Sequence, residues 1–243
     1  MQQLKIILGL LELAAAFKYF SNSDLIWQWG ILDRNFLLST WAIICLISAF
    51  FLLGSVTIHH TRVQKGGPLS FTAAIAFLML SLYFARGLGG ASLNPWVDTY
   101  LPPEIQTLNE SASLQKNSDK DSKNLPWLNK LDEALIQAKQ EDKHVFIDFT
   151  GYTCVNCRWM EKNVFSDPQV MAKFRQDFIL VQLYTDGGKN AEANQILQIN
   201  RFKTVALPLY VILDSDDRLL RHHAGILEPA SSFLYFLSFE DPI

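Results

Sequence analysis

Three apolar runs dominate the first third of the chain, at residues 4–20, 35–58 and 66–86. The second contains no charged residue and the third contains none before Arg86. Each of these two is long enough to cross the apolar core of a bilayer, at a rise of about 1.5 Å per residue. A core helix of a soluble protein is rarely apolar on all sides for so long. The pattern therefore predicts two membrane helices in this part of the chain.

The first run is less uniform, because Glu12 and Lys18 interrupt it. One interpretation is a signal peptide in which Ala14, Ala15 and Ala16 form a weak cleavage signal. A carboxylate within the apolar part argues against this, so we favour a third membrane helix. Glu12 is then a candidate functional residue, although a position near the interface or beside Lys18 explains it equally well. We expect a transmembrane region over residues 1–90 with about three helices.

The pattern changes at residue 91, where the apolar runs end. Pro95, Pro102 and Pro103 are helix breakers, and residues 109–124 are rich in Ser, Asn, Asp and Lys. Such a composition cannot bury a core. We expect residues 91–125 to form a flexible linker.

Residues 126–243 alternate between helical and strand-like patterns, which predicts a separate α/β domain. Pro126 is expected to begin a helix that continues through Leu128, Leu131, Leu135 and Ala138 at helical spacing. The further expected helices cover residues 155–164, 168–175, 190–200 and 229–239, and the expected strands cover 145–149, 178–184, 209–213 and 219–223. We expect a central mixed sheet in this domain.

The charges of the loops predict the orientation in the membrane. Residues 59–65 carry Arg62 and Lys65 and no acid, whereas residues 21–34 carry two acids and one base. The positive-inside rule places the basic loop in the cytoplasm. With three helices, everything after Arg86 then lies outside the membrane.

Overall composition narrows the function only a little. The net charge of −3 argues against a nucleic-acid partner. The chain has 3 cysteines, too few for a disulfide-stabilised scaffold. Cys45, in the second apolar run, is most simply a small buried residue. His222 and His223 alternate along an expected strand and therefore face opposite sides, which argues against a metal site.

The strongest chemical signal is the pair Cys154 and Cys157, between an expected strand and an expected helix. At a helix start, the unpaired backbone N–H groups and the helix dipole favour the thiolate of Cys154. Cys157, one turn later, can resolve a mixed disulfide formed by Cys154. Half of a zinc site or a structural disulfide are alternatives, but zinc usually requires four Cys or His ligands. We therefore favour a thiol–disulfide redox site that needs no other cofactor.

Several segments resemble the thiol:disulfide interchange protein DsbD family. The resemblance to its thioredoxin-like domain lies in VFIDFTGYTCVNCRWME (145–161), VFSDPQV (164–170) and VALPLYVIL (205–213). GLLELAAAFKYFSNSD (9–24) and WGILDR (29–34) look like late membrane segments of that family. The resemblance implies a thioredoxin-like domain after the membrane helices.

The resemblance implies a protein-disulfide reductase of the bacterial inner membrane, with its C-terminal domain in the periplasm. Electrons would come from a cysteine pair in the membrane domain of a DsbD-like protein and pass to periplasmic disulfide-bearing proteins, including those of cytochrome c biogenesis. This chain has fewer membrane helices than the family and the single membrane cysteine Cys45. We therefore expect the C-terminal part of a DsbD-like protein, or a truncated relative.

The resemblance also implies roles for residues around the cysteines. Pro208 would be a cis-proline that orients a partner's backbone, and partner contacts would come from Tyr152, Thr153 and Leu207. Asp148 and Glu161 would lie near the cysteines, where a buried carboxylate could take the proton from Cys157. A surface position remains the alternative for Glu161.

Two further interpretations stay open from the sequence. Arg158 could favour the thiolate through its charge, but we expect it to lie at the surface. The domain could also be a non-catalytic thioredoxin-like interaction module held at the membrane, in which Cys154 would be buried and would form no mixed disulfide.

Overall fold

The computed structural model describes residues 2–55, 67–102 and 125–238. It divides into two compact units. Of the described residues, one unit contains 2–24, 29–55, 67–94 and 101–102 and is helical. The other contains 125–238 with the short segments 25–28 and 95–100 and is an α/β domain.

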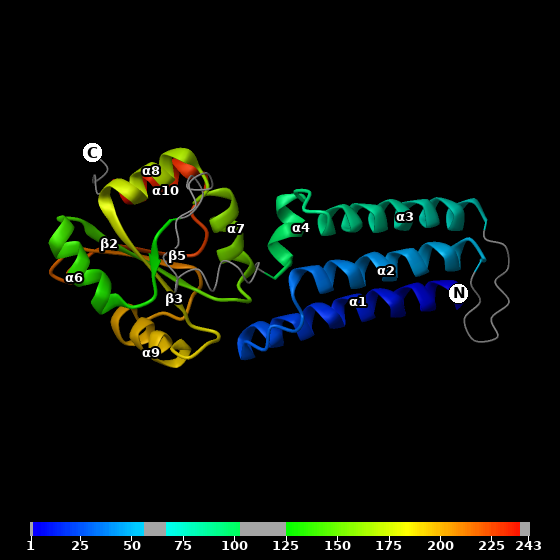
Figure 1. The fold of residues 1–243 in the computed structure, drawn as a ribbon, viewed down its shortest axis with the longest axis horizontal. Coiled ribbons are helices and arrows are strands. Elements are labelled where there is room, and N and C mark those ends of the chain that lie inside the picture. The colour runs from blue at the N-terminus through cyan, green and yellow to red at the C-terminus, as the bar shows by residue number, and fades with distance from the viewer. Residues whose placement is uncertain (1, 56–66, 103–124, 239–243) are drawn as a thin grey trace. The chain divides into compact units, whose positions relative to one another are not determined.

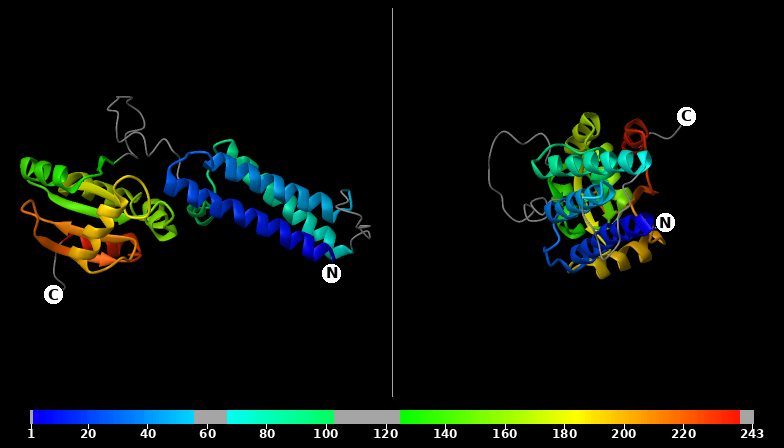
Figure 2. Two further views of the ribbon diagram at one scale, coloured as in Figure 1. Left: turned by 90° about the horizontal axis from the view of Figure 1, so that it is seen from below. Right: turned by 90° about the vertical axis from the view of Figure 1, so that its right-hand side faces the viewer.

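The helical unit is built from three long helices that run side by side (Figures 1 and 2). They are α1 (Gln2–Trp27), α2 (Arg34–Leu52) and α3 (Pro68–Leu88). The indole N–H of Trp41 on α2 donates to the carbonyl of Ala14 on α1 at 3.0 Å. The hydroxyl of Ser81 on α3 donates to the carbonyl of Ala42 on α2 at 2.8 Å. Polar side chains thus connect neighbouring helices through backbone acceptors.

Among the described residues, α2 and α3 are the two helices that are long and apolar enough to cross a membrane. They correspond to the expected helices at 35–58 and 66–86, whose adjoining ends at 56–58 and at 66 lie outside the described residues. The expected helix at 4–20 forms part of α1, which is longer than predicted. The basic loop at 59–65, on which the orientation argument rests, also lies outside the described residues.

A short helix lies within the range expected to be a linker. This helix, α4 (Pro95–Tyr100), begins at Pro95, because a proline suits the first turn, where its missing N–H is not needed. Thr99 on α4 is buried and its hydroxyl donates to the carbonyl of Pro95 at 2.6 Å. The polar residues 109–124 lie outside the described part of the chain.

The α/β domain contains a five-stranded sheet in the order β1-β3-β2-β4-β5. The strands are β1 (Trp127–Leu128), β2 (His144–Thr150), β3 (Phe178–Tyr184), β4 (Leu209–Leu213) and β5 (Leu219–Ala224). β1, β3 and β2 are parallel, while β4 is antiparallel to both β2 and β5. The predicted mixed sheet is therefore confirmed.

Helices cover both faces of this sheet. One face carries α6 (Leu131–Glu141) and α9 (Ala191–Phe202), and the other carries α7 (Val155–Asn163), α8 (Pro168–Asp177) and α10 (Ala230–Leu237). Side chains alternate along β2, so that Phe146 packs towards the second group of helices and Ile147 towards the first. The same alternation directs Asp148 towards the face that α7 covers.

The prediction for the start of the domain was wrong. Pro126 does not begin a helix; Trp127 and Leu128 form the edge strand β1, and α6 begins at Leu131. Tertiary packing explains the difference. The ring centroid of Trp127 lies 6.2 Å from that of Phe146 and 5.9 Å from that of Phe174. This burial of a large aromatic side chain prevails over the local helical spacing.

Candidate functional site

The two cysteines lie where the central strand β2 ends and α7 begins (Figure 1). Cys154 is the N-cap residue of α7, and its sulfur accepts a hydrogen bond from the backbone N–H of Cys157 at 3.2 Å. The two residues form a disulfide with a Cα–Cα distance of 5.3 Å, within the usual range. Cys154 is partly exposed, whereas Cys157 is only 1% exposed. A partner can therefore approach Cys154 more easily than Cys157.

This position favours a nucleophile at Cys154. In the reduced state, the same N–H group can donate to a Cys154 thiolate, and the N-terminus of α7 places its positive dipole end there. The buried Cys157 lies one turn further, where its sulfur can attack a disulfide made by Cys154. The arrangement has the geometry that thiol–disulfide exchange requires.

The turn before Cys154 is bound to the loop after β3. The carboxylate of Asp186 accepts hydrogen bonds from the backbone N–H of Tyr152 at 2.8 Å and from that of Thr153 at 2.9 Å. It also accepts one from the Thr153 hydroxyl at 2.8 Å. Tyr152 and Thr153, two of the three expected partner-contact residues, are partly exposed. Nothing in the sequence indicated that Asp186 joins this turn.

The segment before β4 contains the expected cis-proline. The Leu207–Pro208 peptide bond is cis, and the carbonyl of Pro208 accepts a hydrogen bond from the N–H of Gly225 at 2.7 Å. Pro208 is buried, while Leu207 before it is partly exposed. Leu207 thus presents part of its surface to solvent, as a partner-contact residue must.

Asp148 and Glu161 are brought together by a third side chain, that of Gln182 on β3. Its amide donates to Asp148 Oδ2 at 3.1 Å and to Glu161 Oε1 at 3.0 Å. Asp148 is 1% exposed, and its burial, with the charge of Glu161, raises its pKa to about 7. Burial also raises the pKa of Glu161, although Arg158 opposes that rise. The sequence analysis did not identify Gln182 as part of this group, because it is a single polar residue in an otherwise apolar strand.

Arg158 is not at the surface, so our expectation for it was wrong. The residue is 7% exposed, and its guanidinium forms an ion pair with Glu161 Oε2 at 2.7 Å. It also donates to the hydroxyl of Thr150 at 3.1 Å. Burial alone would lower the pKa of Arg158, but Glu161 next to it produces a net rise. The Arg158 side chain is long enough for its guanidinium to reach Thr150 at the end of β2. The spacing of residues in the sequence does not predict this contact.

Two tyrosines complete this polar layer. The hydroxyl of Tyr184 donates to Gln182 Oε1 at 3.1 Å, and its ring lies under the Arg158 guanidinium at 5.9 Å. Tyr210 is the cross-strand neighbour of Asp148 on β4. Within the described residues, Asp148 Oδ1 and the Tyr210 hydroxyl are both buried without a hydrogen-bond partner. Asp148 therefore retains an oxygen that can accept a proton.

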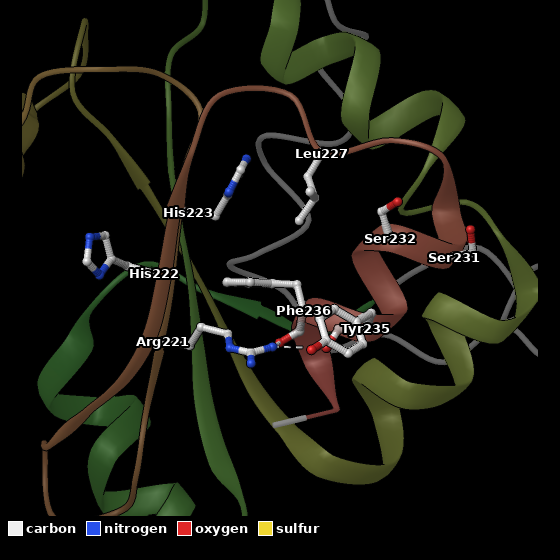
Figure 3. A pocket seen from close by; sticks show the side chains of 8 residues that line it. All are labelled: Arg221, His222, His223, Leu227, Ser231, Ser232, Tyr235 and Phe236. Atoms are coloured by element: carbon white, nitrogen blue, oxygen red, sulfur yellow. Dashed lines mark hydrogen bonds between the residues drawn. The ribbon is translucent and has the colours of Figure 1, made fainter. Parts of the chain in front are cut away.

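A separate open pocket lies between β5 and α10, away from the cysteine motif in sequence (Figure 3). His222 and His223 point to opposite sides of β5 in this view, as their alternation predicts. Arg221 in the same pocket donates to the carbonyl of Tyr235 at the end of α10, at 3.1 Å. In the part of the chain that the structure describes, no group of three or more Cys, His, Asp or Glu side chains could hold a metal ion.

Comparison with known proteins agrees with this geometry. Residues 126–215 match the model of a family described as Thioredoxin-like. The chain is 23% identical over 224 residues to the thiol:disulfide interchange protein DsbD of Campylobacter jejuni strain RM1221, and equally to that of strain NCTC 11168. The chain is related to the DsbD thiol:disulfide interchange proteins. Each alignment covers 91% of this chain but 34% of the DsbD protein, so the chain spans about a third of its curated relatives.

Two solved structures are similar to part of the chain at low sequence identity. A DsbH oxidoreductase is 20% identical, with a TM-score of 0.41, and the match covers 51% of this chain and 88% of DsbH. A thioredoxin from Thermus thermophilus is 21% identical, with a TM-score of 0.37, and the match covers 46% of this chain and 82% of the thioredoxin.

The thioredoxin-like domain, the DsbD relatives and the Cys154–Cys157 pair together support a thiol–disulfide oxidoreductase. Proteins of this kind use a redox-active disulfide rather than a bound cofactor. Their exchange reaction implies partner proteins that carry disulfides.

Proposed function

We propose that the protein is a membrane-anchored disulfide reductase that passes electrons through Cys154 and Cys157 to periplasmic proteins. One observation carries this proposal most: a partly exposed Cys154 at the N-cap of α7 is paired with a buried Cys157. The direction of electron flow is taken from the resemblance to the DsbD family, and the apolar helices α2 and α3 support the anchor.

In the proposed reaction, the reduced protein begins with Cys154 as a thiolate and Cys157 as a thiol. The Cys154 thiolate attacks a partner's disulfide, which forms a mixed disulfide and releases the first partner sulfur as a thiolate that takes up a proton. Cys157 then loses its proton and attacks the sulfur of Cys154. The second partner sulfur leaves as a thiolate, the Cys154–Cys157 disulfide forms, and two electrons have moved to the partner.

We assign the proton from Cys157 to Asp148. This carboxyl group lies on the sheet face that α7 covers, and its Oδ1 has no hydrogen-bond partner among the described residues. Its pKa of about 7 allows it both to accept and to release a proton near neutral pH. Glu161 is the second carboxylate of this group, and it is linked to Asp148 through Gln182. We propose further that Pro208 and Leu207, with Tyr152 and Thr153, contact the partner's chain.

The electron donor in this proposal is the cysteine pair of a DsbD-like membrane domain. The acceptors are disulfide-bearing periplasmic proteins. The loop charges noted above support an inner-membrane location with the α/β domain in the periplasm. With α1 as a third membrane helix, this orientation places the N-terminus of the chain in the cytoplasm.

The test uses the full chain in detergent micelles with a fluorescent disulfide substrate and dithiothreitol as the reductant. We expect the wild-type protein to accelerate reduction and Cys154→Ser to abolish the acceleration. In a parallel reaction, Cys157→Ser that has been reduced and then freed of dithiothreitol should capture the substrate as a stable mixed disulfide through Cys154, visible by mass spectrometry.

A Cys45→Ala variant is the matched control, because this cysteine lies in α2, outside the α/β domain. It should retain full activity. If Cys157→Ser captures no substrate and the wild type does not accelerate reduction, the domain is a non-catalytic interaction module and our proposal fails.

A further inference from the structure

The loop that follows β3 is tightly bonded to the turn that precedes Cys154. Besides the three hydrogen bonds that Asp186 accepts from Tyr152 and Thr153, the backbone N–H of Thr185 donates to the carbonyl of Thr150 at 3.0 Å. The Thr185 hydroxyl points to the same carbonyl at 3.4 Å. These bonds connect the segment that follows β2 with the segment that follows β3, more than thirty residues apart in the sequence. The two segments meet because β2 and β3 are parallel neighbours in the sheet.

The glycine at position 151 allows the Asp186 carboxylate to lie this close to the turn. At Gly151, an added Cβ atom would lie 2.7 Å from the carboxylate oxygen Oδ2 of Asp186 and 2.9 Å from its Cγ. Real Cβ atoms do not come so close, so any larger residue would push the carboxylate away. The glycine therefore allows Asp186 to bond the next two backbone N–H groups directly.

This arrangement affects Cys154 in two ways. The backbone of Thr153 is bonded covalently to Cys154, so a fixed Thr153 amide fixes where α7 starts and where the Cys154 sulfur points. The Asp186 carboxylate is also bonded to Thr153, the residue directly before Cys154, so its negative charge opposes a thiolate at Cys154. A less stable thiolate makes the reduced form less favourable, which makes a dithiol a stronger reductant.

We propose that Asp186 is a positioning residue for the exchange reaction, which holds the Tyr152–Thr153 turn so that Cys154 meets its partner in one geometry and makes the dithiol more strongly reducing. The inference rests on the proposed function, because it names what orients and tunes the same cysteine pair. Asp186 itself neither bonds to the partner nor takes part in electron transfer.

Three substitutions separate the effect of the hydrogen bonds from the effect of the charge. Thr153→Val removes only the hydroxyl bond at nearly constant volume and keeps the charge of Asp186. Asp186→Asn removes the charge and presents an NH₂ group to one of the two N–H donors. Asp186→Ala removes every bond and the charge. Asp216→Asn, which alters an exposed carboxylate of the same domain, is the control.

The experiment measures two quantities on the full chain in micelles. The first is the rate of substrate disulfide reduction, and the second is the equilibrium ratio of oxidised to reduced protein in glutathione buffers. We expect Asp186→Asn and Asp186→Ala to lower the rate about tenfold and to lower the oxidised-to-reduced ratio about threefold. Thr153→Val should slow exchange about threefold and leave the ratio unchanged. Asp216→Asn should match the wild type in both.

A purely structural role for Asp186 would lower the melting temperature without changing the equilibrium ratio. An unchanged ratio and an unchanged rate in Asp186→Asn, beside an active wild type, would overturn this inference and leave the proposed function standing. An inactive wild type would instead overturn the proposed function and the inference together. Thr153→Val and Asp186→Asn keep the test decisive if Asp186→Ala does not fold.

Discussion

At the scale of single residues, the notable feature is a group of buried and partly buried ionisable side chains on the sheet face that α7 covers. Asp148 and Glu161 are joined by Gln182, and Arg158 offsets their charge. Burying a carboxylate costs free energy unless a partner compensates, and Asp148 is compensated only in part because its Oδ1 has no partner among the described residues. Buried ionisable groups with shifted pKa values are concentrated at functional sites, which agrees with the proton-transfer role that we propose for Asp148.

The raised pKa of Asp148 predicts how stability depends on pH. Its pKa rises from 3.8 to about 7 on folding, so between these values the folded protein binds more protons than the unfolded chain. The free energy of unfolding therefore falls as pH rises through this window, and the full loss is present above it. Asp148→Asn should stabilise the protein by about 3 kcal/mol at about pH 8 and by little at about pH 4.

Urea unfolding at the two pH values measures this difference. Asp216→Asn, at an exposed position, is the control and should show no such pH dependence. Equal stabilisation by Asp148→Asn at both pH values would contradict the assignment of the raised pKa to Asp148.

The buried ion pair makes a second prediction. Arg158→Met leaves the Glu161 carboxylate, whose side chain is only 23% exposed, without its cation, so it should lower the free energy of unfolding by about 3 kcal/mol. Adding Glu161→Gln should recover most of that loss, because the uncompensated charge is then gone. Lys130→Met breaks an ion pair of the same i,i+3 spacing at an exposed site and should leave the urea midpoint unchanged. A double variant as unstable as Arg158→Met alone would show that packing, not charge, explains the effect.

At the scale of elements, α7 and α8 each start at a residue whose side chain caps the helix. Cys154 caps α7 through its sulfur, and Asp167 caps α8 through its carboxylate, with Pro168 at the first helical position. Asp167 Oδ1 accepts hydrogen bonds from the N–H groups of Gln169 at 2.8 Å and Val170 at 3.4 Å. Helix α8 contributes Phe174 to the same buried core to which α7 contributes Met160. The cap that stabilises the start of α8 therefore also stabilises this core.

Removal of this cap should therefore cause a measurable loss of stability. Asp167→Ala leaves two N–H groups without their acceptor and should lower the free energy of unfolding by about 1 kcal/mol. Asp167→Asn preserves one acceptor oxygen and should lose less than half of that. Urea titration of the full chain in micelles checks both, and an unchanged midpoint for Asp167→Ala would show that solvent replaces the cap without loss.

At the scale of the whole molecule, two units of different character share one chain. The helical unit contains two helices apolar enough for a bilayer, and the α/β domain contains the cysteine pair. A reductase of periplasmic proteins requires Cys154 on the periplasmic side of the inner membrane. The location of this one sulfur therefore tests the topology that we propose.

A membrane-impermeant maleimide can report this location in spheroplasts. In a Cys45→Ala/Cys157→Ser variant, Cys154 is the sole thiol and should be labelled without permeabilisation. In a Cys154→Ser/Cys157→Ser variant, the sole thiol is Cys45, buried within α2, and it should not react until detergent is added. Labelling of Cys154 only after permeabilisation would place the α/β domain in the cytoplasm and contradict the proposal.

The sequence alone predicted the parts of the fold that local patterns specify. Strands 178–184 and 209–213 have the predicted bounds, and the helix after the first cysteine begins at the predicted Val155. Apolar residues in continuous runs or at helical spacing carry this information within a few neighbouring positions. The cysteine pair was recognisable for the same reason, because its spacing and its place at a helix start are both local.

Only the tertiary structure determined which distant residues surround that pair. Asp186 bonds the turn before Cys154 from the far end of β3, and Gln182 joins two carboxylates that lie on different elements. Arg158 is buried because its long side chain extends to the end of β2, and Trp127 belongs to a strand because an aromatic core receives it. These outcomes depend on parallel pairing of β2 with β3 and on packing across the sheet, which bring together residues that no local pattern connects.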